Sequence, residues 1–333
     1  MVLGDGIRRD VAEISPEERT LLRDAFVSLS DDPAFRYPDG VSYWDKQNEI
    51  HQATHVHAFP PARGIAFLPW HRELCNRLEA LLRTVDYRLS LHYWDWTTNP
   101  RNSSGVNLLT PDFMGSPRGE AGWPFQNFET TGPADPNSPD PDHRKIWRDV
   151  PKGSPPAPSD RFIVTDIDEN GDEVPLGQQY SAFRKRLETA HNRMHVWFGG
   201  TVGGDPHFPF HDPFVFLLHS NVDRLFALWQ TSRAERLDPE KVYGDEGDSD
   251  VNTDPAVHDY DPGILTLLEP WAGNPTDDLH VTQIRPWTEP DNENLRPENQ
   301  KNSRHITVVT PPHYDTNRLH TEEPSPEDPD HHG

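Results

Sequence analysis

Residues 212–224 read DPFVFLLHSNVDR, a run in which apolar side chains surround one histidine, His219. This pattern predicts a buried helix that continues to about Arg233. An unpaired imidazole buried among Phe214 and Phe216 would be costly, so His219 requires a partner in the folded protein. We therefore expect His219 to belong to a site.

Two aspartates bracket this helix, and each has two possible roles. Asp212 and Asp223 could accept a hydrogen bond from the ring N–H of a metal-bound histidine and so fix its orientation. Alternatively, Asp212 could cap the helix N-terminus, and Asp223 could form a salt bridge with Arg224. The sequence favours neither role over the other.

A second histidine motif lies upstream, where residues 191–195 read HNRMH. His191 and His195 stand at positions i and i+4 of a predicted helix, Ala182 to Phe198. Their Cβ atoms should therefore lie about 5–6 Å apart on one face. With His219 they can supply three imidazoles to one metal ion.

A third motif, FLPWHRE at residues 67–73, places His71 at the start of another predicted helix, which begins near Trp70. The preceding helix, Tyr43 to His57, carries His51, His55 and His57. Two of these three suffice to complete a second set of three imidazoles with His71. Neither set includes a carboxylate or thiol at ligand spacing, and neutral nitrogen donors suit copper better than calcium, magnesium or an iron–sulfur cluster. We read the pattern as a two-copper oxygen site.

The bulk composition excludes several classes of partner. The 333 residues carry a formal net charge of -24, which argues against binding to nucleic acid or to an anionic membrane surface. The single cysteine, Cys75, excludes an internal disulfide. The N-terminal residues have no apolar signal segment and no run approaches a membrane span, so we expect a cytoplasmic protein.

The 35 prolines and 21 glycines favour long loops around a helical centre. A further helix should begin at Ser15-Pro16, where a cap, a proline and acidic residues follow one another. Residues 98–160 are predicted to form loops. Phe162 to Leu176 is predicted to form a β-hairpin that turns at Asn170-Gly171. The glycine-rich stretch 199–204 is interpreted as a backbone turn that leaves the copper site open, and beside it His207 and His211 are expected to be exposed to solvent.

The three histidine motifs, in this order, resemble the two copper-binding regions of the tyrosinase and polyphenol oxidase family, the type-3 dinuclear copper proteins, in their short bacterial form. The resemblance covers roughly residues 40–230 and implies a mainly α fold: a four-helix bundle that holds two copper ions, with long proline-rich loops and a few short strands. It assigns one copper (CuA) to His51, His57 and His71, and the other (CuB) to His191, His195 and His219. His55 is the rival of His57, because residues 59–63 read as an insertion.

This resemblance also implies an organisation along the chain. Residues 1–243 form the copper domain, with the CuA region at 43–82 and the CuB region at 182–233. Residues 244–320, acidic and proline-rich, are expected to wrap the core. Residues 321–333 are expected to be a disordered tail.

The implied activity is a phenol oxidase that uses O₂ to hydroxylate monophenols at the ortho position and to oxidise o-diphenols to o-quinones. In the family, a glutamate and the asparagine after the first CuB histidine are thought to hold the water that deprotonates a monophenol. Glu188 and Asn192 match these two positions, although Glu188 could instead pair with Arg184 or Lys185 on the helix surface. Val196, Gly203, Gly204 and Asp205 are expected to line the substrate pocket, and the apolar Val196 together with the net charge favours an uncharged phenol.

Three alternatives remain open. The first is a catechol oxidase or o-aminophenol oxidase without monophenol activity. The second is an oxygen carrier similar to hemocyanin. The third, a di-zinc hydrolase, is disfavoured because no carboxylate is positioned to bridge two metals. A chaperone that loads copper is a possible partner.

Overall fold

A computed structural model describes residues 3–37, 40–57, 66–118, 123–129, 137, 139, 144–164, 176–204, 206–238 and 311–315 of the chain, with residues 53–57, 161 and 176–179 described by their backbone alone. In this part of the chain the regular elements are helices, and β-structure is confined to isolated bridges. In chain order they are α1 Pro16–Asp31, α2 Tyr43–His57, α3 Phe67–Val85, α4 Asp160–Val164, α5 Leu176–Phe198, α6 Gly200–Gly203, η2 Pro209–His211, α7 Phe214–Thr231 and η3 Ala234–Leu237. The prediction of a mainly α fold is confirmed.

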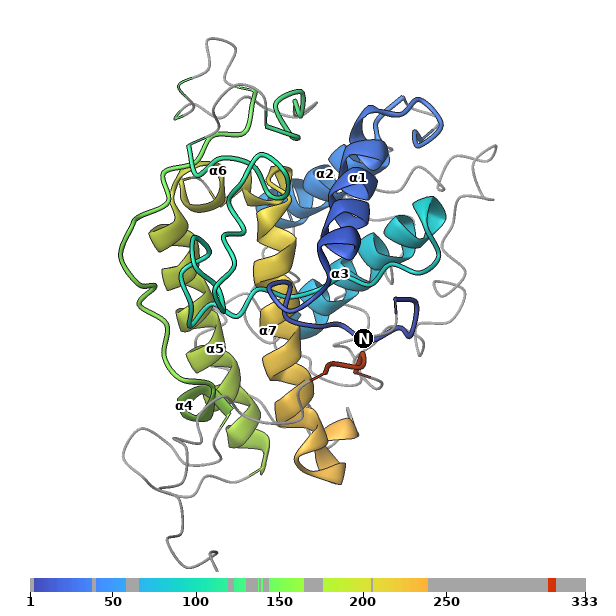
Figure 1. Ribbon diagram of the computed structural model, residues 1–333. Helices are drawn as coiled ribbons and strands as arrows, with labels where there is room; N and C mark the ends of the chain where they lie inside the picture. The colour runs from blue at the N-terminus through green and yellow to red at the C-terminus, as the bar shows by residue number, and fades with distance from the viewer. Residues whose placement is uncertain are drawn as a thin grey trace, which may run out of the picture.

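Helix α7 forms the centre of the molecule (Figure 1). Most of its side chains are apolar, and almost all of them, polar ones included, are buried. A helix of this kind must be surrounded by other elements. It packs against α3 and α4, and the ring of Trp229 near its C-terminus stacks on Phe183 of α5, with centroids 4.8 Å apart.

Helices α5 and α7 run side by side in opposite directions (Figure 1). Phe183 near the start of α5 meets Trp229 near the end of α7, whereas His191 further along α5 meets His219 in the first half of α7. This antiparallel arrangement brings two sequence motifs that lie far apart in the chain to the same level of the bundle.

Helix α1 covers the bundle from outside. Ser15 caps it by accepting a hydrogen bond from the Glu18 N–H, and Pro16 stands at its first position, as predicted. Leu22, Phe26 and the other buried residues of α1 form one face. Phe26 contacts Trp44 of α2 edge-on, with ring centroids 5.4 Å apart, and this contact ties α1 to the helix that carries His51.

The bounds of α2 agree with the prediction, but α3 begins at Phe67, three residues before Trp70. Pro69 therefore lies inside the first turn of α3. Proline is tolerated there because the first N–H groups of a helix have no partner within the helix. The residues of the predicted insertion, 59–63, lie outside the described part of the chain.

The predicted hairpin Phe162–Leu176 is wrong at both ends. Phe162 to Val164 belong to the short helix α4, and Leu176 is the first residue of α5, which begins six residues before the predicted Ala182. The Ser159 hydroxyl accepts a hydrogen bond from the Phe162 N–H and so favours a helical turn, which overrides the strand tendency of Ile163 and Val164. The predicted turn at Asn170-Gly171 lies outside the described residues.

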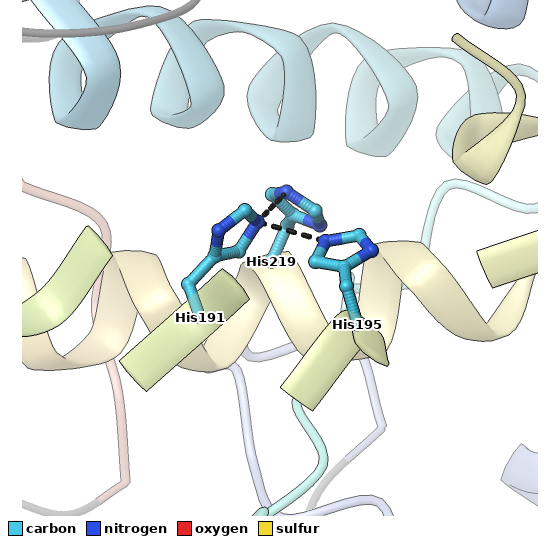
Figure 2. Close-up of side chains that lie close together, drawn as sticks. All are labelled: His191, His195 and His219. Atoms are coloured by element: carbon cyan, nitrogen blue, oxygen red, sulfur yellow. Dashed lines mark hydrogen bonds between the residues drawn. The ribbon is translucent and has the colours of Figure 1, made fainter. Parts of the chain in front are cut away.

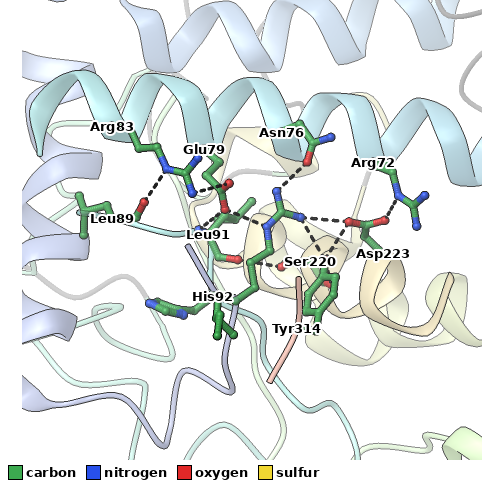
Figure 3. A network of polar contacts seen from close by, with 12 residues as sticks. Arg72, Asn76, Glu79, Arg83, Leu89, Leu91, His92, Ser220, Asp223 and Tyr314 are labelled. Atoms are coloured by element: carbon green, nitrogen blue, oxygen red, sulfur yellow. Dashed lines mark hydrogen bonds and ion pairs between the residues drawn. The ribbon is translucent and has the colours of Figure 1, made fainter. Parts of the chain in front are cut away.

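A buried polar network joins α3 and α7 to both ends of the described chain (Figure 3). The Arg8 guanidinium, 1% exposed, contacts Glu79 of α3 at 2.8 Å and Asp223 of α7 at 3.0 Å. Asp223 also forms an ion pair with Arg72 of α3. The Tyr314 hydroxyl donates to Asp223 at 2.8 Å.

Residues 311–315 pack against the N-terminal segment. The Arg8 N–H donates to the His313 carbonyl, and the Asp315 N–H donates to the Arg8 carbonyl. These five residues fall in the segment 244–320 that was predicted to wrap the core. The remainder of that segment and the predicted tail lie outside the described residues, so the proposed domain boundaries stay predictions. None of the helices described here has the length and apolar character that crossing a membrane requires.

Candidate metal centre

Four helices direct histidines toward one pocket of about 430 Å³. The histidines whose side chains are described there are His51 from α2, His71 from α3, His191 and His195 from α5, and His219 from α7. All are buried except His195, which is partly buried. The fold thus gathers the whole of one predicted histidine set, and His51 and His71 of the other, at one place.

Three of these rings meet at their Nε2 atoms (Figure 2). The Nε2 atom of His191 lies 2.9 Å from that of His219 and 2.8 Å from that of His195. His191 and His195 are presented by successive turns of α5, as their i, i+4 spacing predicted, and His219 faces them from α7. These three residues form a group whose geometry suits one metal ion.

The hydrogen bonds of the three Nδ1 atoms explain why the contacts between the Nε2 atoms indicate a cation site. The Nδ1–H of His195 donates to the Val202 carbonyl at 2.7 Å, and that of His219 donates to the Val215 carbonyl at 2.9 Å. The Nδ1–H of His191 donates to the Asn192 side-chain oxygen at 2.9 Å. A neutral imidazole carries one proton, so all three Nε2 atoms present lone pairs to one another. Three lone pairs this close repel unless a cation lies between them.

The environment keeps two of these rings neutral. Burial lowers the pKa of His195 to about 4, although its hydrogen bond to Val202 acts in the opposite direction. Burial also lowers the pKa of His219 well below its ordinary value, and the neighbouring histidines contribute to this. Both rings therefore carry a free lone pair at neutral pH, which is the form that binds metals.

The second histidine group, His51 and His71, lies directly beside the first. The ring of His71 stacks on that of His219, with centroids 4.7 Å apart, and lies 5.9 Å from the ring of His51. The Nδ1–H of His71 donates to the Phe67 carbonyl at 2.8 Å, one turn earlier in α3. The Nε2 atom of His71, like that of His219, thus faces away from this hydrogen bond and could bind a metal. The side chains of His55 and His57 lie outside the description, so the choice between them stays open.

These residues fit copper. The donors that converge in the described lining are imidazole nitrogens, which suit copper. Among the described lining residues, the one carboxylate is that of Glu188. It forms an ion pair with Arg184 at 2.7 Å, one turn away on α5.

Two phenylalanine rings pack against the histidines of the pocket. Phe67 packs on His71 and His191, with ring centroids 4.7 and 4.9 Å apart. Phe210 packs on His51 and His219 at 4.4 and 4.6 Å. Phe67 belongs to a motif that the sequence singled out. Phe210 was missed, and the only available signal was its place in an aromatic stretch just before Asp212.

The predicted proton-transfer residues lie at the pocket, each with an additional contact. Glu188 and Asn192 both line it. The carboxylate of Glu188 pairs with Arg184, as the alternative interpretation had it, and the Asn192 side-chain oxygen accepts from His191. Both roles considered for Glu188 are therefore compatible with its position.

Three of the four residues expected to line the substrate pocket do so, namely Val196, Gly203 and Gly204. Asp205 lies outside the described residues. Val196 is 74% exposed and stands at the mouth. The glycine-rich stretch, predicted to be a simple turn, contains a single turn of helix, α6.

The aspartates that bracket α7 do not orient the described histidines of the pocket. The acceptors are backbone carbonyls for His71, His195 and His219 and the Asn192 side chain for His191. Asp212 accepts from the Phe214 N–H at the start of α7, as the capping alternative predicted, and pairs with Arg148 at 2.6 Å. Asp223 pairs with Arg72 and Arg8, and the predicted pairing with Arg224 is wrong.

The expectation for His211 is also wrong. It is 3% exposed, and its Nε2–H donates to the Arg144 carbonyl at 3.1 Å. It is buried because η2 packs against α2. His207 is half-buried, and it is not part of the described pocket lining.

Comparison with known proteins gives a consistent picture. Residues 41–232 match the family model described as the common central domain of tyrosinase. A tyrosinase from Streptomyces lincolnensis is 32% identical over 182 residues, which cover 50% of this chain and 63% of that protein. Hemocyanin type 2 unit e from Rapana venosa is 30% identical over 258 residues, which cover 71% of this chain and 57% of that protein. The chain thus spans less than two thirds of either relative.

A solved structure supports the fold. A functional unit of Octopus hemocyanin superimposes with a TM-score of 0.54 and 19% identity, covering 94% of this chain and 69% of that one. The helical architecture around the histidines is therefore a known one.

Proposed function

Because the chain belongs to the tyrosinase family, whose members are type-3 dinuclear copper proteins, we propose that it is a copper-dependent phenol oxidase. It uses O₂ to oxidise o-diphenols to o-quinones and to hydroxylate monophenols at the ortho position. The observation that carries this proposal is the convergence of neutral imidazoles, with their Nε2 lone pairs facing one another, at the base of a pocket that is open to solvent.

His191, His195 and His219 would hold one copper ion, and His51 and His71 would hold the other together with His57. Two copper ions so held supply the electron transfer between the phenol and O₂. The chain's own contribution is to keep His195 and His219 neutral by burial. The carbonyls of Phe67, Val202 and Val215 orient the rings of His71, His195 and His219.

The pocket suits a single aromatic ring. Its volume of about 430 Å³ lies in the range typical of small-molecule sites. Phe67, Val202, Pro206 and Pro209 give it apolar walls. Among the described lining residues there is no cationic side chain that could bind a carboxylate group of the substrate. An uncharged phenol is therefore the proposed substrate.

Hydroxylation of a monophenol requires removal of its proton before the oxygen atom can bind a metal. Glu188 is the candidate base, acting through a water held with Asn192. Its ion pair with Arg184 fixes the position of the carboxylate one helical turn from His191. Oxidation of an o-diphenol depends less on this residue, because its first hydroxyl group is more acidic.

Oxygen binding without catalysis is the second candidate, because a hemocyanin unit is among the relatives. An oxygen carrier must keep phenols away from its metals. Val196 at the pocket mouth is 74% exposed, which favours substrate access and hence the oxidase.

The deciding test measures O₂ uptake by copper-loaded protein with an uncharged monophenol and, in parallel, the matching catechol. We expect uptake with both substrates. Uptake with the catechol alone would indicate a catechol oxidase, and reversible O₂ binding without turnover would indicate a carrier.

A variant pair tests the proposed ligands. His219→Ala should bind one copper fewer per chain and lose O₂ uptake, since its ring is 1% exposed and its Nε2 atom belongs to the triad. His313→Ala, which removes an exposed ring in the segment 311–315, should retain both properties. Full activity of His219→Ala would contradict the ligand assignment.

A further inference from the structure

The hydrogen bond that orients His195 differs from those of His71 and His219 in the element that supplies its acceptor. His71 and His219 donate to carbonyls of their own helices, four residues earlier. His195 lies near the C-terminal end of α5 and donates instead to Val202, seven residues later in α6. The orientation of this ring therefore depends on where α6 is placed relative to α5.

Glycines allow α6 to fold back closely on α5. Gly199 and Gly200 have φ values of +68° and +60°, which favour glycine. A Cβ atom on Gly203 would stand 2.1 Å from the His195 carbonyl oxygen. The Val202 carbonyl belongs to the peptide that joins Val202 to Gly203, so any displacement of Gly203 moves the acceptor of His195.

A loop from another part of the chain holds α6 from outside. The Thr201 N–H donates to the Trp147 carbonyl at 2.8 Å, and the Trp147 N–H donates to the Thr201 hydroxyl at 3.0 Å. A Cβ atom on Gly200 would stand 2.4 Å from the Trp147 carbonyl oxygen. The loop and α6 are therefore in backbone contact and are joined by two reciprocal hydrogen bonds.

The same loop is attached to the helix that carries His219. Arg148, which follows Trp147, pairs with Asp212 through two contacts of 2.6 Å, and both side chains are completely buried. Asp212 accepts from the Phe214 N–H at the first residue of α7. One dipeptide, Trp147-Arg148, thus contacts both α6 and the start of α7.

We propose that Trp147-Arg148 and Thr201 act as positioning residues for the metal held by His191, His195 and His219. They set the location of the Val202 carbonyl, and through it the orientation of His195 toward His191 and His219. None of these three residues belongs to the described lining of the pocket. This inference rests on the proposed metal centre, because it assigns these residues an effect on metal affinity.

The hydroxyl of Thr201 allows a sharp test. Thr201→Val keeps the shape of the side chain and removes the acceptor of the Trp147 N–H, whereas Thr201→Ser keeps the acceptor. Both are made in the full chain that also carries His71→Ala, so that titration reports the His191–His195–His219 site alone. Co²⁺ serves as the probe, since its visible absorption depends on its ligands. Loss of a residue that orients a ligand typically weakens metal binding about 10–100-fold.

We expect Thr201→Val to weaken Co²⁺ binding within that range and Thr201→Ser to restore it, with unchanged far-UV circular dichroism and thermal midpoint of the metal-free protein. Equal affinity of the valine variant and its parent would overturn the proposal. Equal weakening in both variants would also overturn it, as would a loss of affinity that merely follows a lower thermal midpoint of the metal-free protein.

Gly203→Ala provides a second, independent perturbation of the Val202 carbonyl, and Gly153→Ala is its control, because a Cβ atom at Gly153 meets nothing within 4 Å. The alanine at 203 should weaken Co²⁺ binding, and the alanine at 153 should not. If the chain without any of these substitutions binds no Co²⁺, the metal centre itself is refuted, an outcome distinct from failure of the positioning role.

Discussion

The Nδ1 protons of His71, His195 and His219 all go to backbone carbonyls. A carboxylate acceptor would stabilise the protonated ring, because its negative charge favours imidazolium. A carbonyl orients the ring without adding charge. This choice of acceptor agrees with the lowered pKa values of His195 and His219, and it leaves the aspartates beside α7 free for structural ion pairs.

At the residue scale, Glu188 separates the two proposed reactions. Glu188→Gln removes the base and should lower kcat/KM for a monophenol by roughly 100-fold, a typical contribution of a general base. Turnover of the matching catechol should change little. Steady-state O₂ uptake with both substrates measures the difference.

The control for this substitution is Glu235→Gln, which alters an exposed glutamate on η3. It should leave both reactions unchanged. Equal losses with the two substrates in Glu188→Gln would assign the Arg184 ion pair a structural role only.

At the scale of elements, the ion-pair network fixes α3 against α7. Arg72 follows His71 in the sequence, and Asp223 lies one turn after His219, so their ion pair links the two histidine-bearing turns directly. Arg8 of the N-terminal segment reinforces it through its own contact with Asp223. The spacing of these two helices is thus set by buried charges beside the site.

Asp223→Asn tests this link. It leaves Arg72 and Arg8 buried without their shared counter-charge, which typically costs about 3–5 kcal/mol of the free energy of unfolding. Urea denaturation of the metal-free protein measures that free energy. Asp24→Asn, which removes the exposed partner of Arg23, should cost at most about 1 kcal/mol. Similar values for both variants would show that the network does not stabilise the fold.

At the scale of the whole molecule, a net charge of -24 reflects a large excess of carboxylates. Some of these carboxylates are buried close to one another. Asp10 is an example, with 5% of its surface exposed. Burial raises the pKa of Asp10 to about 6, and the nearby carboxylates of Asp95, Glu13 and Asp315 add to the effect. Its ionisation at neutral pH therefore opposes folding.

The sign of the pH dependence follows from the raised pKa. Between the unfolded value near 4 and the folded value of about 6, the folded state binds more protons, so the contribution of Asp10 to stability falls as the pH rises. Two pKa units correspond to about 3 kcal/mol. Between pH 4 and pH 7.5, the free energy of unfolding of Asp10→Asn should therefore rise by roughly that amount relative to the free energy of unfolding of the unmodified protein. Urea denaturation across that pH range measures both values. A pH-independent difference would contradict this account.

Local signals in the sequence predicted the five long helices, two of them with a later start than the structure shows, and the histidines that they carry. Tyr43–His57 and the start of α1 were predicted with their correct bounds because caps and apolar spacing are local signals. The i, i+4 spacing of His191 and His195 likewise fixed their common face. The same local reasoning failed at Phe162–Val164, where a serine cap outweighed the strand tendency of two β-branched residues.

Which groups orient and cover these histidines could be learned only from the folded chain. The partner of His195 in α6, the aromatic cover from Phe210, the burial of His211 and the pairing of Asp223 with Arg72 all join segments that are separate in the chain. Such contacts depend on how helices pack, and packing leaves no periodic signal in the sequence. The sequence therefore indicated the candidate ligands, and the fold determines which groups hold them in place.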